Sequence, residues 1–436
     1  MAGLMFGGAF AGGGSGGGQN VNKLKAIQSL SGGYGNPITI AYGLNKVSMT
    51  LGWYNGFRAI KQDSGGGKGG GKGAGGSYKY YANVLFFVCE GPILSFGKFW
   101  RDKDKSATTT PKVLSKGSDG DYDVVPWDFI VTKYPAEALA YRGTAYLASS
   151  GYPLRDGAVL GNHSVEVRGR MITNSPGTQN EKDAFIKDVI LDFVENPHYG
   201  VVDANTYQFS YDFSALHDYT RARGLLISPV LASRKPANEW LKEWLMVANA
   251  ACIFSEGVLK FPPYADLSYS NSFATYTPDT AIRYHFDDDN IDQLLKPERK
   301  NPADCYNKIQ VDCLSRVRDY NKHPIEVKDE ADIRLNGLRT AEKLTFESIC
   351  LPSIAMVVAH TELSKGLNIR NTYTISTSWD ADLLEPLDFI TITDAALGLN
   401  NTRCRIVSIE DDEVTESGGA TIRIRAEEAP IGVYCG

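Results

Sequence analysis

The sequence predicts an α+β protein that has several domains and is rich in strands. Runs of β-branched and aromatic residues dominate residues 37–169, apolar residues at helical spacing follow in residues 181–251, and strand-like runs return in the last third of the chain. This order indicates strands and helices that are segregated along the chain. The length of 436 residues exceeds what one hydrophobic core normally serves, so we expect two to four domains.

The first predicted strands flank the most unusual part of the chain. Pro37–Tyr42 and Val47–Trp53 combine β-branched and aromatic residues, with turn residues between them. Tyr78–Cys89 is the most apolar run in the sequence, and the turn residues Glu90-Gly-Pro92 end it. We predict three strands here, preceded by a flexible glycine-rich arm over residues 1–35.

A tract of glycine and lysine, residues 65–76, connects the second and third of these strands. Glycine has no side chain to bury and loses much backbone entropy on ordering, so we expect the tract to be exposed or mobile until a partner orders it. Gly66–Lys72 matches the start of a phosphate-binding loop, but Gly73 stands where that loop needs serine or threonine. A predicted strand follows instead of a helix, which excludes phosphate binding of that kind.

Three more strands are predicted in the first half of the chain, at Val124–Val131, Tyr141–Leu147 and His163–Gly169. The first two are rich in β-branched and aromatic residues, and the third alternates. A polar stretch over residues 102–123 precedes them and is expected to form a loop or a small excursion from the first domain.

The middle of the chain has helical periodicity. Apolar residues four positions apart predict one helix over Glu181–Glu195 and another over Ala237–Ala251. Trp240 and Trp244 fall in one row of the second helix, where packing in a core is the expected role of tryptophan. A hairpin that turns at Glu256-Gly257 is predicted directly after this helix.

The last part of the chain returns to strands. Cys305–Cys313 alternates like a strand, and Thr340–Lys365 has helical character. Pro352 is expected to split or kink that helix, and Gly366 to end it. Closing strands are predicted at Thr372–Ser378, at Phe389–Thr393 with Arg403–Ser408, and at Thr421–Arg425.

The distribution of charge excludes one class of function. A net charge of −6 argues against a general nucleic-acid-binding protein, which needs a basic surface. Residues 37–101 carry +6, which leaves −12 for the rest of the chain. Such asymmetry suits an acidic and a basic surface that meet in copies of the chain or in neighbouring proteins, although solvated lysines on a loop would give the same sum.

Targeting segments are not predicted. No run approaches the ~18 apolar residues of a membrane span. Residues 1–18 have no basic start and too many glycines for a signal peptide. We therefore expect no stable membrane insertion and synthesis in the cytosol.

The cysteines indicate a reducing compartment. They are odd in number, never form Cys-x-x-Cys, and mostly lie within apolar runs. This predicts free, buried thiols, with no disulfide framework and no zinc site. The seven residues are Cys89, Cys252, Cys305, Cys313, Cys350, Cys404 and Cys435.

One acidic segment has the spacing of a metal site. Asp119, Asp121 and Asp123 match the first three ligands of a calcium loop. The sixth position of that loop is not glycine, and Ile130 takes the place of the bidentate glutamate at the twelfth. A polar turn is the favoured interpretation, and a metal site is the alternative.

The densest group of carboxylates is Asp287-Asp-Asp-Asn290 followed by Asp292. Neighbouring side chains of an extended segment point to opposite sides, so these carboxylates cannot all face one substrate, and a solvated turn is predicted. The alternative is a cell-wall or polysaccharide hydrolase in which Asp287, Asp288 or Asp292 contributes to a carboxylate pair.

The histidines supply no catalytic pattern either. They lie far apart in the sequence, without metal-ligand spacing, and no triad can be nominated from them. We therefore predict a protein that is not an enzyme, with no catalytic, cofactor-binding or metal-binding residues. The six residues are His163, His198, His217, His285, His323 and His360.

Several short motifs occur in a characteristic order between about residues 35 and 430. They are Gly35–Gly43, Val47–Phe57, the glycine and lysine tract with Tyr78–Val88 and Cys89–Ile93, Tyr141–Tyr146, Gly161-Asn162, Ser164–Val167, Ala237–Trp240, Phe254–Phe261, Asn301–Asp304, Asn307 and Leu384–Ile390. In this order the chain resembles the central hub, or tip attachment, proteins of long-tailed bacteriophages. That group includes the tip attachment protein of phage lambda and the hub of gene transfer agents.

The resemblance implies a β-rich α+β fold with two related, tube-like β-barrel domains and mixed α/β domains inserted between or after them. The implied first β-barrel domain spans residues 36–175, with loops at 65–76 and 102–123. A helical or mixed domain would span residues 176–300. A second mixed domain, ending in barrel strands, would span residues 301–436.

The resemblance also implies a function at the tip of the virion tail. Three copies would form a pseudo-sixfold ring that caps the hexameric tail tube and opens for DNA ejection. The implied partners are distal tail or tube proteins, the tape-measure protein and other tip or fibre proteins, and DNA would pass through the lumen without sequence-specific binding. The hub of a contractile injection apparatus or baseplate is an alternative.

Overall fold

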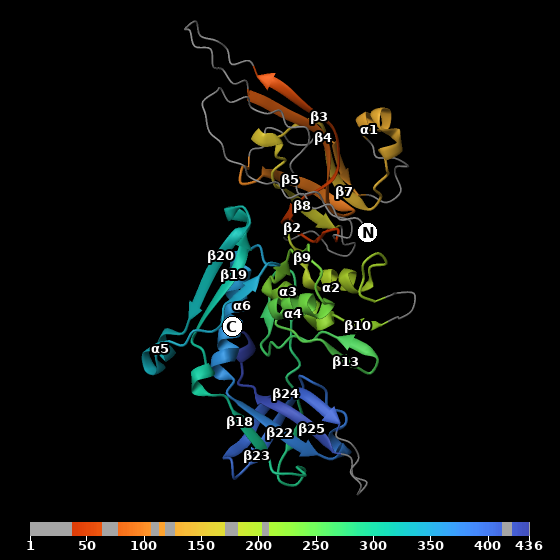
Figure 1. The fold of residues 1–436 in the computed structure, drawn as a ribbon. Helices are drawn as coiled ribbons and strands as arrows, with labels where there is room; N and C mark the ends of the chain where they lie inside the picture. Colours follow the sequence, from red (N-terminus) through yellow and green to blue (C-terminus); the bar gives the residue numbers. More distant parts are fainter. Residues whose placement is uncertain are drawn as a thin grey trace, which may run out of the picture. The chain divides into compact units, whose positions relative to one another are not determined.

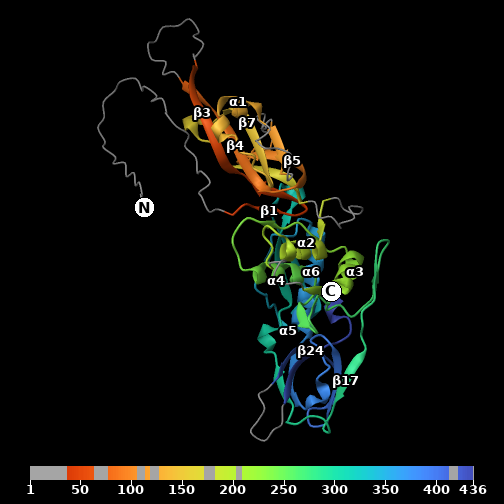
Figure 2. The same cartoon turned by 90° about the vertical axis from the view of Figure 1, so that its right-hand side faces the viewer.

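The computed structural model describes residues 37–62, 77–105, 113–117, 127–170, 182–202, 209–411 and 421–435, which form two compact units (Figures 1 and 2). The first unit contains residues 48–88 and 98–165, and the second contains residues 37–47, 89–97 and those from 166 onward. The chain therefore passes between the units after residues 47, 88, 97 and 165. The predicted arm and the glycine and lysine tract lie outside the described residues.

A four-stranded sheet with the order β3-β4-β7-β6 is the basis of the first unit. In this sheet, Val84 and Phe86 of β4 pack with Tyr152 on one face, and Leu85 packs with Trp127 on the other. Because both faces are covered, the strand predicted at residues 78–89 can contain the unbroken apolar run Val84–Cys89. The strands are β3 (Thr50–Gln62), β4 (Ser77–Glu90), β7 (Thr144–Pro153) and β6 (Val113–Lys116).

Helix α1 (Asp128–Lys133) corrects the second half of the predicted strand over Val124–Val131, while residues 124–126 lie outside the described residues. Trp127 and Ile130 are three positions apart, so one helical turn places both in the same buried cluster. Asp128 in the first turn also favours a helix start. The β-branched residues of this segment were therefore a misleading signal, because burial on one helical face outweighs strand propensity. The single turns η1 (Pro135–Glu137) and η2 (Asp156–Ala158) belong to the same unit.

A second sheet has the order β2-β8-β5. Its strands are β2 (Leu44–Ser48), β8 (His163–Arg170) and β5 (Ile93–Arg101), and each of the three contains residues of both units. The strand predicted over His163–Gly169 is thereby confirmed. The one predicted over Tyr141–Leu147 begins later, at Thr144.

The core of the second unit gathers around α2 (Ile186–Glu195), α3 (Ser214–Arg223), α4 (Ala237–Val247) and α6 (Pro352–Asn368). Trp240 and Trp244 are buried in this core, as predicted. Helix α3 was not predicted, because polar residues surround its few buried side chains, Leu216, Tyr219 and Thr220, and obscure the apolar spacing. It ends at Gly224, whose φ of +69° suits a glycine C-cap.

Short strands connect these helices. The hairpin of β13 and β14 turns at Glu256 and Gly257, both with positive φ, as the sequence predicted. The pairs are β1 (Ile40–Ala41) with β12 (Val230–Leu231), β9 (Ala184–Phe185) with β11 (Leu226–Ile227), β15 (Tyr269–Ser270) with β16 (Thr275–Tyr276), and β14 (Val258–Lys260) with both β10 (Ser210–Asp212) and β13 (Ile253–Ser255).

Helix α6 lies against the hairpin of β19 (Lys308–Ser315) and β20 (Asn321–Lys328), with α5 (Glu330–Asn336) directly after it (Figure 1). The predicted helix over Thr340–Lys365 is wrong in its first part, where β21 (Leu344–Phe346) runs parallel to β19. Pro352 begins α6 instead of kinking it, because the first helical position needs no N–H donor. The helix also continues past Gly366 to Asn368.

The chain closes in a six-stranded sheet with the order β17-β23-β24-β25-β22-β18. Its strands are β17 (Ile282–Phe286), β23 (Phe389–Asp394), β24 (Leu399–Asp411), β25 (Ile422–Glu428), β22 (Asn371–Thr377) and β18 (Lys296–Arg299), which confirms the predicted closing strands. Within the described residues β17 and β18 are open edges, and no sheet closes on itself. The α+β class is confirmed, whereas the barrels stay a prediction.

The thiols largely follow their prediction. All seven cysteines are free, and six of them are buried, while Cys252 is exposed. Within the part of the chain that the structure describes, no helix is long and apolar enough to cross a membrane.

His163 is a buried histidine in the core of the first unit. Its Nε2 lies 2.7 Å from Tyr152 Oη, its Nδ1 lies 3.1 Å from the Gly161 carbonyl, and its ring lies 4.8 Å from that of Phe86. Burial, together with the nearby positive charge of Arg101, lowers the pKa of His163 to about 4. The ring is therefore neutral in the folded protein near pH 7.

We predict that the first unit loses stability on acidification because of His163. Its pKa is lower in the folded state than the usual ~6.5, so the unfolded state binds the proton more tightly, and stability falls as the pH drops from about 6.5 towards 4. The loss should approach about 3 kcal/mol. Urea unfolding at several pH values should show it, and His163→Gln should flatten the dependence.

The matched control is His360→Gln, because His360 is exposed on α6. It should leave the pH dependence of unfolding unchanged. A His163→Gln protein with the same pH dependence as the wild type would contradict the role of His163.

Candidate functional site

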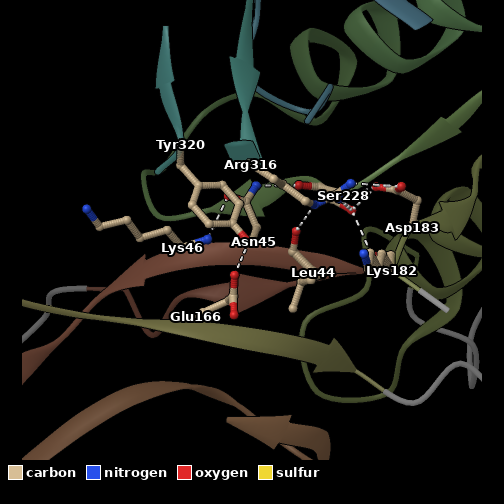
Figure 3. Close-up of polar contacts among 9 residues, drawn as sticks. All are labelled: Leu44, Asn45, Lys46, Glu166, Lys182, Asp183, Ser228, Arg316 and Tyr320. Carbon is tan, nitrogen blue, oxygen red and sulfur yellow. Dashed lines mark hydrogen bonds and ion pairs between the residues drawn. The ribbon is translucent and has the colours of Figure 1, made fainter. Parts of the chain in front are cut away.

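Segments that are far apart in the sequence meet in a polar junction within the second unit (Figure 3). We define the junction by Leu44, Asn45, Lys46, Glu166, Lys182, Asp183, Ser228, Arg316 and Tyr320. It lies where the chain is about to leave this unit after residue 47 and has just returned to it at residue 166. The junction is therefore placed to fix both connecting segments.

Arg316 is the centre of the junction. Its Nε donates to the Leu44 carbonyl at 3.1 Å, and its Nη1 donates to Asp183 Oδ2 at 3.0 Å. Its Nη2 donates both to Asp183 Oδ1 and to Ser228 Oγ, the latter at 3.0 Å. The guanidinium thus binds the carboxylate with two parallel bonds and uses its remaining side for the backbone of residue 44 (Figure 3).

Backbone geometry presents Arg316 and Tyr320 to the junction. Both lie in the turn that joins β19 to β20, which begins with η4 (Arg316–Arg318). Asp319 and Tyr320 have φ values of 54° and 64°, in the left-handed region, which reverses the chain tightly. Tyr320 Oη then donates to Glu166 Oε1 at 2.8 Å, so one turn holds both sides of the junction.

Ser228 joins the remaining segments. Its Oγ lies 2.7 Å from Asp183 Oδ1, and its carbonyl accepts a bond of 2.6 Å from Asn45 Nδ2. Asn45 Oδ1 in turn accepts from the Lys46 amide at 2.7 Å, and the Leu44 amide donates to the Lys182 carbonyl. The polar groups of residues 44–46 are therefore satisfied by partners from several segments.

The opposite charges of Asp183 and Arg316 are buried together in the junction. The side chain of Asp183 is 1% exposed and that of Arg316 is 11% exposed. Burial lowers the pKa of Arg316, but the hydrogen bond and the charge of Asp183 outweigh burial, so the pKa rises and the guanidinium stays charged. Burial and the bond to Glu166 raise the pKa of Tyr320, which keeps its hydroxyl a donor.

Two glycines let the backbones approach closely beside the junction. A Cβ on Gly43, whose φ is +60°, would lie 2.1 Å from Ser228 Oγ. A Cβ on Gly169 would lie 2.1 Å from the Ala41 carbonyl oxygen. Only glycine fits at these positions, because neither the backbone nor a buried serine can retreat far.

Tyr42 anchors the same segment on its other side. It is fully buried, and its Oη donates to Asp192 Oδ2 at 2.7 Å. Asp192 also accepts from Tyr199 Oη and lies 3.6 Å from Arg170 Nε. Together with the pairing of β1 and β12, these contacts make residues 40–46 an integral part of the second unit.

The structure describes only part of the carboxylates that the sequence offered for chemistry. Asp287–Asn290 is a turn, as predicted, in which the Asp289 amide donates to Asp287 Oδ1 at 3.1 Å, and Asp288 and Asp292 are exposed. Asp119, Asp121 and Asp123 lie outside the described residues. Within the described ranges, no group of three or more His, Cys, Asp or Glu side chains is arranged to hold a metal ion.

Sequence reasoning did not single out Arg316, Asp183 or Ser228. A weak signal existed for Ser228, which lies in the apolar run Leu225–Leu231 and is fully buried. Asp183 lies 133 residues and Ser228 lies 88 residues before Arg316 in the sequence. No local pattern could therefore pair them with Arg316.

Part of the chain is similar to a family of phage tail proteins. Residues 236–409 match the family Phage-tail_3, described as "Putative phage tail protein". No curated protein sequence matches the chain.

One of the solved structures that resemble the chain has a TM-score above 0.5 and shows the shared fold. A chain from the structure titled "Virion of native gene transfer agent (GTA) particle" is 15% identical with a TM-score of 0.61, covering 95% of this chain and 90% of that chain. The 43 kDa tail protein of prophage MuSo2 from Shewanella oneidensis is 11% identical with a TM-score of 0.36, over 89% of this chain and 96% of that one. A tail protein from Neisseria meningitidis MC58 is 12% identical with a TM-score of 0.38, over 90% and 99%.

We predict that Arg316→Met destabilises the second unit by roughly 3–5 kcal/mol, because it leaves the carboxylate of Asp183 buried without its partner. Urea unfolding followed by tryptophan fluorescence would measure the change. The control is Arg318→Met in the same turn, where the side chain is exposed, and it should change stability by less than about 0.5 kcal/mol. Equal effects of the two substitutions would contradict the importance of the ion pair.

A second prediction concerns Gly43. Gly43→Ala should destabilise the protein by at least ~1 kcal/mol more than Gly224→Ala. Both glycines have positive φ, +60° and +69°, but a Cβ at Gly224 meets nothing within 4 Å, whereas one at Gly43 meets Ser228. Thermal unfolding of the two variants isolates the steric part, and equal midpoints would show that residue 43 can shift freely.

Proposed function

We propose that the protein is the central hub of a phage-type tail tip, a homotrimer that caps the tail tube and opens for DNA ejection. The observation that carries this proposal is the fold shared over 95% of the chain with a chain of a gene transfer agent virion. The match of residues 236–409 to a phage tail family supports a place in a tail. The proposed partners are distal tail or tube proteins, the tape-measure protein and other tip or fibre proteins.

The proposed domains follow from the same resemblance. Residues 36–175 would form a first barrel-like domain, residues 176–300 a helical or mixed domain, and residues 301–436 a second mixed domain with the closing strands. The six-stranded sheet ends in two open edges, and barrel closure would require further pairing there.

Open strand edges support a function in assembly. The edge strand β3 is 13 residues long and exposes Tyr54 and Ile60, each 45% accessible. Long edges with exposed apolar residues are normally covered in a soluble protein, because they pair readily with other chains. A ring of copies seated on a tube would cover them.

The junction suits a protein that transmits force between neighbours. Hydrogen bonds, an ion pair and a buried tyrosine hold residues 40–46 in the second unit. Because residues 40–46 are fixed in this way, they would stay in the second unit when the partners of the hub move and pull on the chain that follows them.

We predict that the purified protein sediments with three times its chain mass of 47.7 kDa, and that it forms a larger complex with a purified tail-tube protein. Sedimentation velocity of the protein alone and of the mixture would test this. A monomer that ignores the tube protein at micromolar concentration would contradict the proposal.

A digestion assay on the same purified protein distinguishes a hub from a hydrolase. A hub should release no fragments from purified cell wall or capsular polysaccharide. Cleavage that is lost on replacing Asp287, Asp288 and Asp292 by alanine would instead establish the alternative based on the carboxylates.

A further inference from the structure

The second unit contains a groove of about 1000 Å³. It lies between helices α4 and α6 on one side and strands β18, β22 and β25 on the other. Apolar side chains, among them Leu241, Met246 and Ile369, contribute to its lining. We call it the basic groove, because its remaining lining is dominated by Lys and Arg side chains.

Six basic and three acidic side chains line the basic groove, in a chain whose net charge is −6. Each acid already has a partner: Glu362 pairs with Lys365 at 2.6 Å, Glu298 with Arg425 at 3.5 Å, and Glu427 accepts from Tyr434. The other basic residues form no ion pair within the part of the chain that the structure describes. They are Lys242, Arg299, Lys300 and Arg370.

Two of these four cations have a local role. Lys300 Nζ donates to the Gly366 carbonyl at 3.0 Å, and Arg370 Nε donates to the Leu367 carbonyl at 3.1 Å, which satisfies the last turn of α6. Lys242 and Arg299 are exposed, and their side chains make no such bond to any of the residues that the structure describes. They are the charges that a bound partner would meet.

A polyanion such as nucleic acid is a poor match for this lining. The carboxylates of Glu298, Glu362 and Glu427 would repel closely spaced phosphates, and the apolar side chains would gain nothing from them. A protein segment that combines apolar side chains with separated carboxylates matches both features.

The chain itself presents such a segment at the other end of the same sheet. The loop that follows β22 exposes Trp379 by 56% and Leu383 by 93%, with the exposed carboxylate of Asp382 between them. The turn at Asp287–Asn290 lies beside this loop, because the amide of nearby Asp292 donates to the Ser376 carbonyl at 2.8 Å. We call residues 378–384 the acidic loop.

The acidic loop cannot fill the groove of its own chain. Thr372 lines the groove, whereas the loop begins after Thr377, at the opposite end of β22. Five residues of strand separate them by roughly 17 Å, at ~3.3 Å per residue. The two surfaces can therefore meet only between two copies.

We propose that the acidic loop of one copy binds in the basic groove of the next. The contact is heterologous, since it joins two different surfaces, and repeated contacts of this kind close into a ring when the rotation between copies allows it. This inference rests on the proposed trimeric function and names the surfaces that would hold the trimer together. Trp379 would supply the buried anchor, and Lys242 and Arg299 would pair with the acidic residues.

Two double variants test the contact. The groove variant is Lys242→Glu with Arg299→Glu, and the loop variant is Trp379→Ala with Asp382→Lys. All four side chains are exposed, so both variants should fold, with an unchanged thermal midpoint. Arg318→Glu with Arg334→Glu makes the same change in charge as the groove variant at exposed positions outside the groove, and serves as its control.

The expected result by sedimentation is that each variant alone associates at least tenfold more weakly than the wild type. The control should behave as the wild type. An equimolar mixture of the two variants should form dimers and stop there, because it retains one intact groove and one intact loop. That outcome distinguishes this contact from any symmetric one.

Other outcomes overturn the inference. Trimers of normal strength in both variants would leave the proposed function standing and remove these surfaces from it. An effect of the groove variant alone would assign the groove to a different occupant. A wild-type protein that stays monomeric would overturn both the contact and the proposed trimer.

Discussion

The buried ion pair between Arg316 and Asp183 is the interaction on which the arrangement of the second unit depends. Both side chains are nearly inaccessible to water, so each charge needs the other to avoid a large loss of solvation energy. The fork geometry of the guanidinium leaves donors free for the Leu44 carbonyl and for Ser228. A single side chain thus fixes the β19–β20 turn, the segment before α2 and the chain's first strands in one geometry.

Much of the fold could be predicted from local patterns. The apolar run at residues 78–89, the tryptophan row of α4 and the hairpin at Glu256-Gly257 each carry a strong signal within a few residues, and all three appear in the structure. The errors occur where burial overrides propensity. The turn of helix at Asp128–Lys133 packs Ile130 into the core, and Leu344–Phe346 extends the sheet beside β19 in spite of its helical context.

The junction could not be predicted in the same way. Residues that bond to each other in it are separated by up to 272 positions, and each is an ordinary residue in its own neighbourhood. The requirement for glycine at position 43 also becomes clear only when Ser228 is placed opposite it. Long-range polar contacts of this kind follow from the topology, which a sequence without aligned relatives does not reveal.

The four passages of the chain between the two units have a mechanical consequence. Tension applied to the first unit divides over several peptide connections in parallel, so no single one bears it all. A protease that cuts one connection would leave the halves covalently joined through the others. The first unit is built from separate stretches of the chain. Its loss or exchange during evolution would therefore require coordinated changes at several points of the gene.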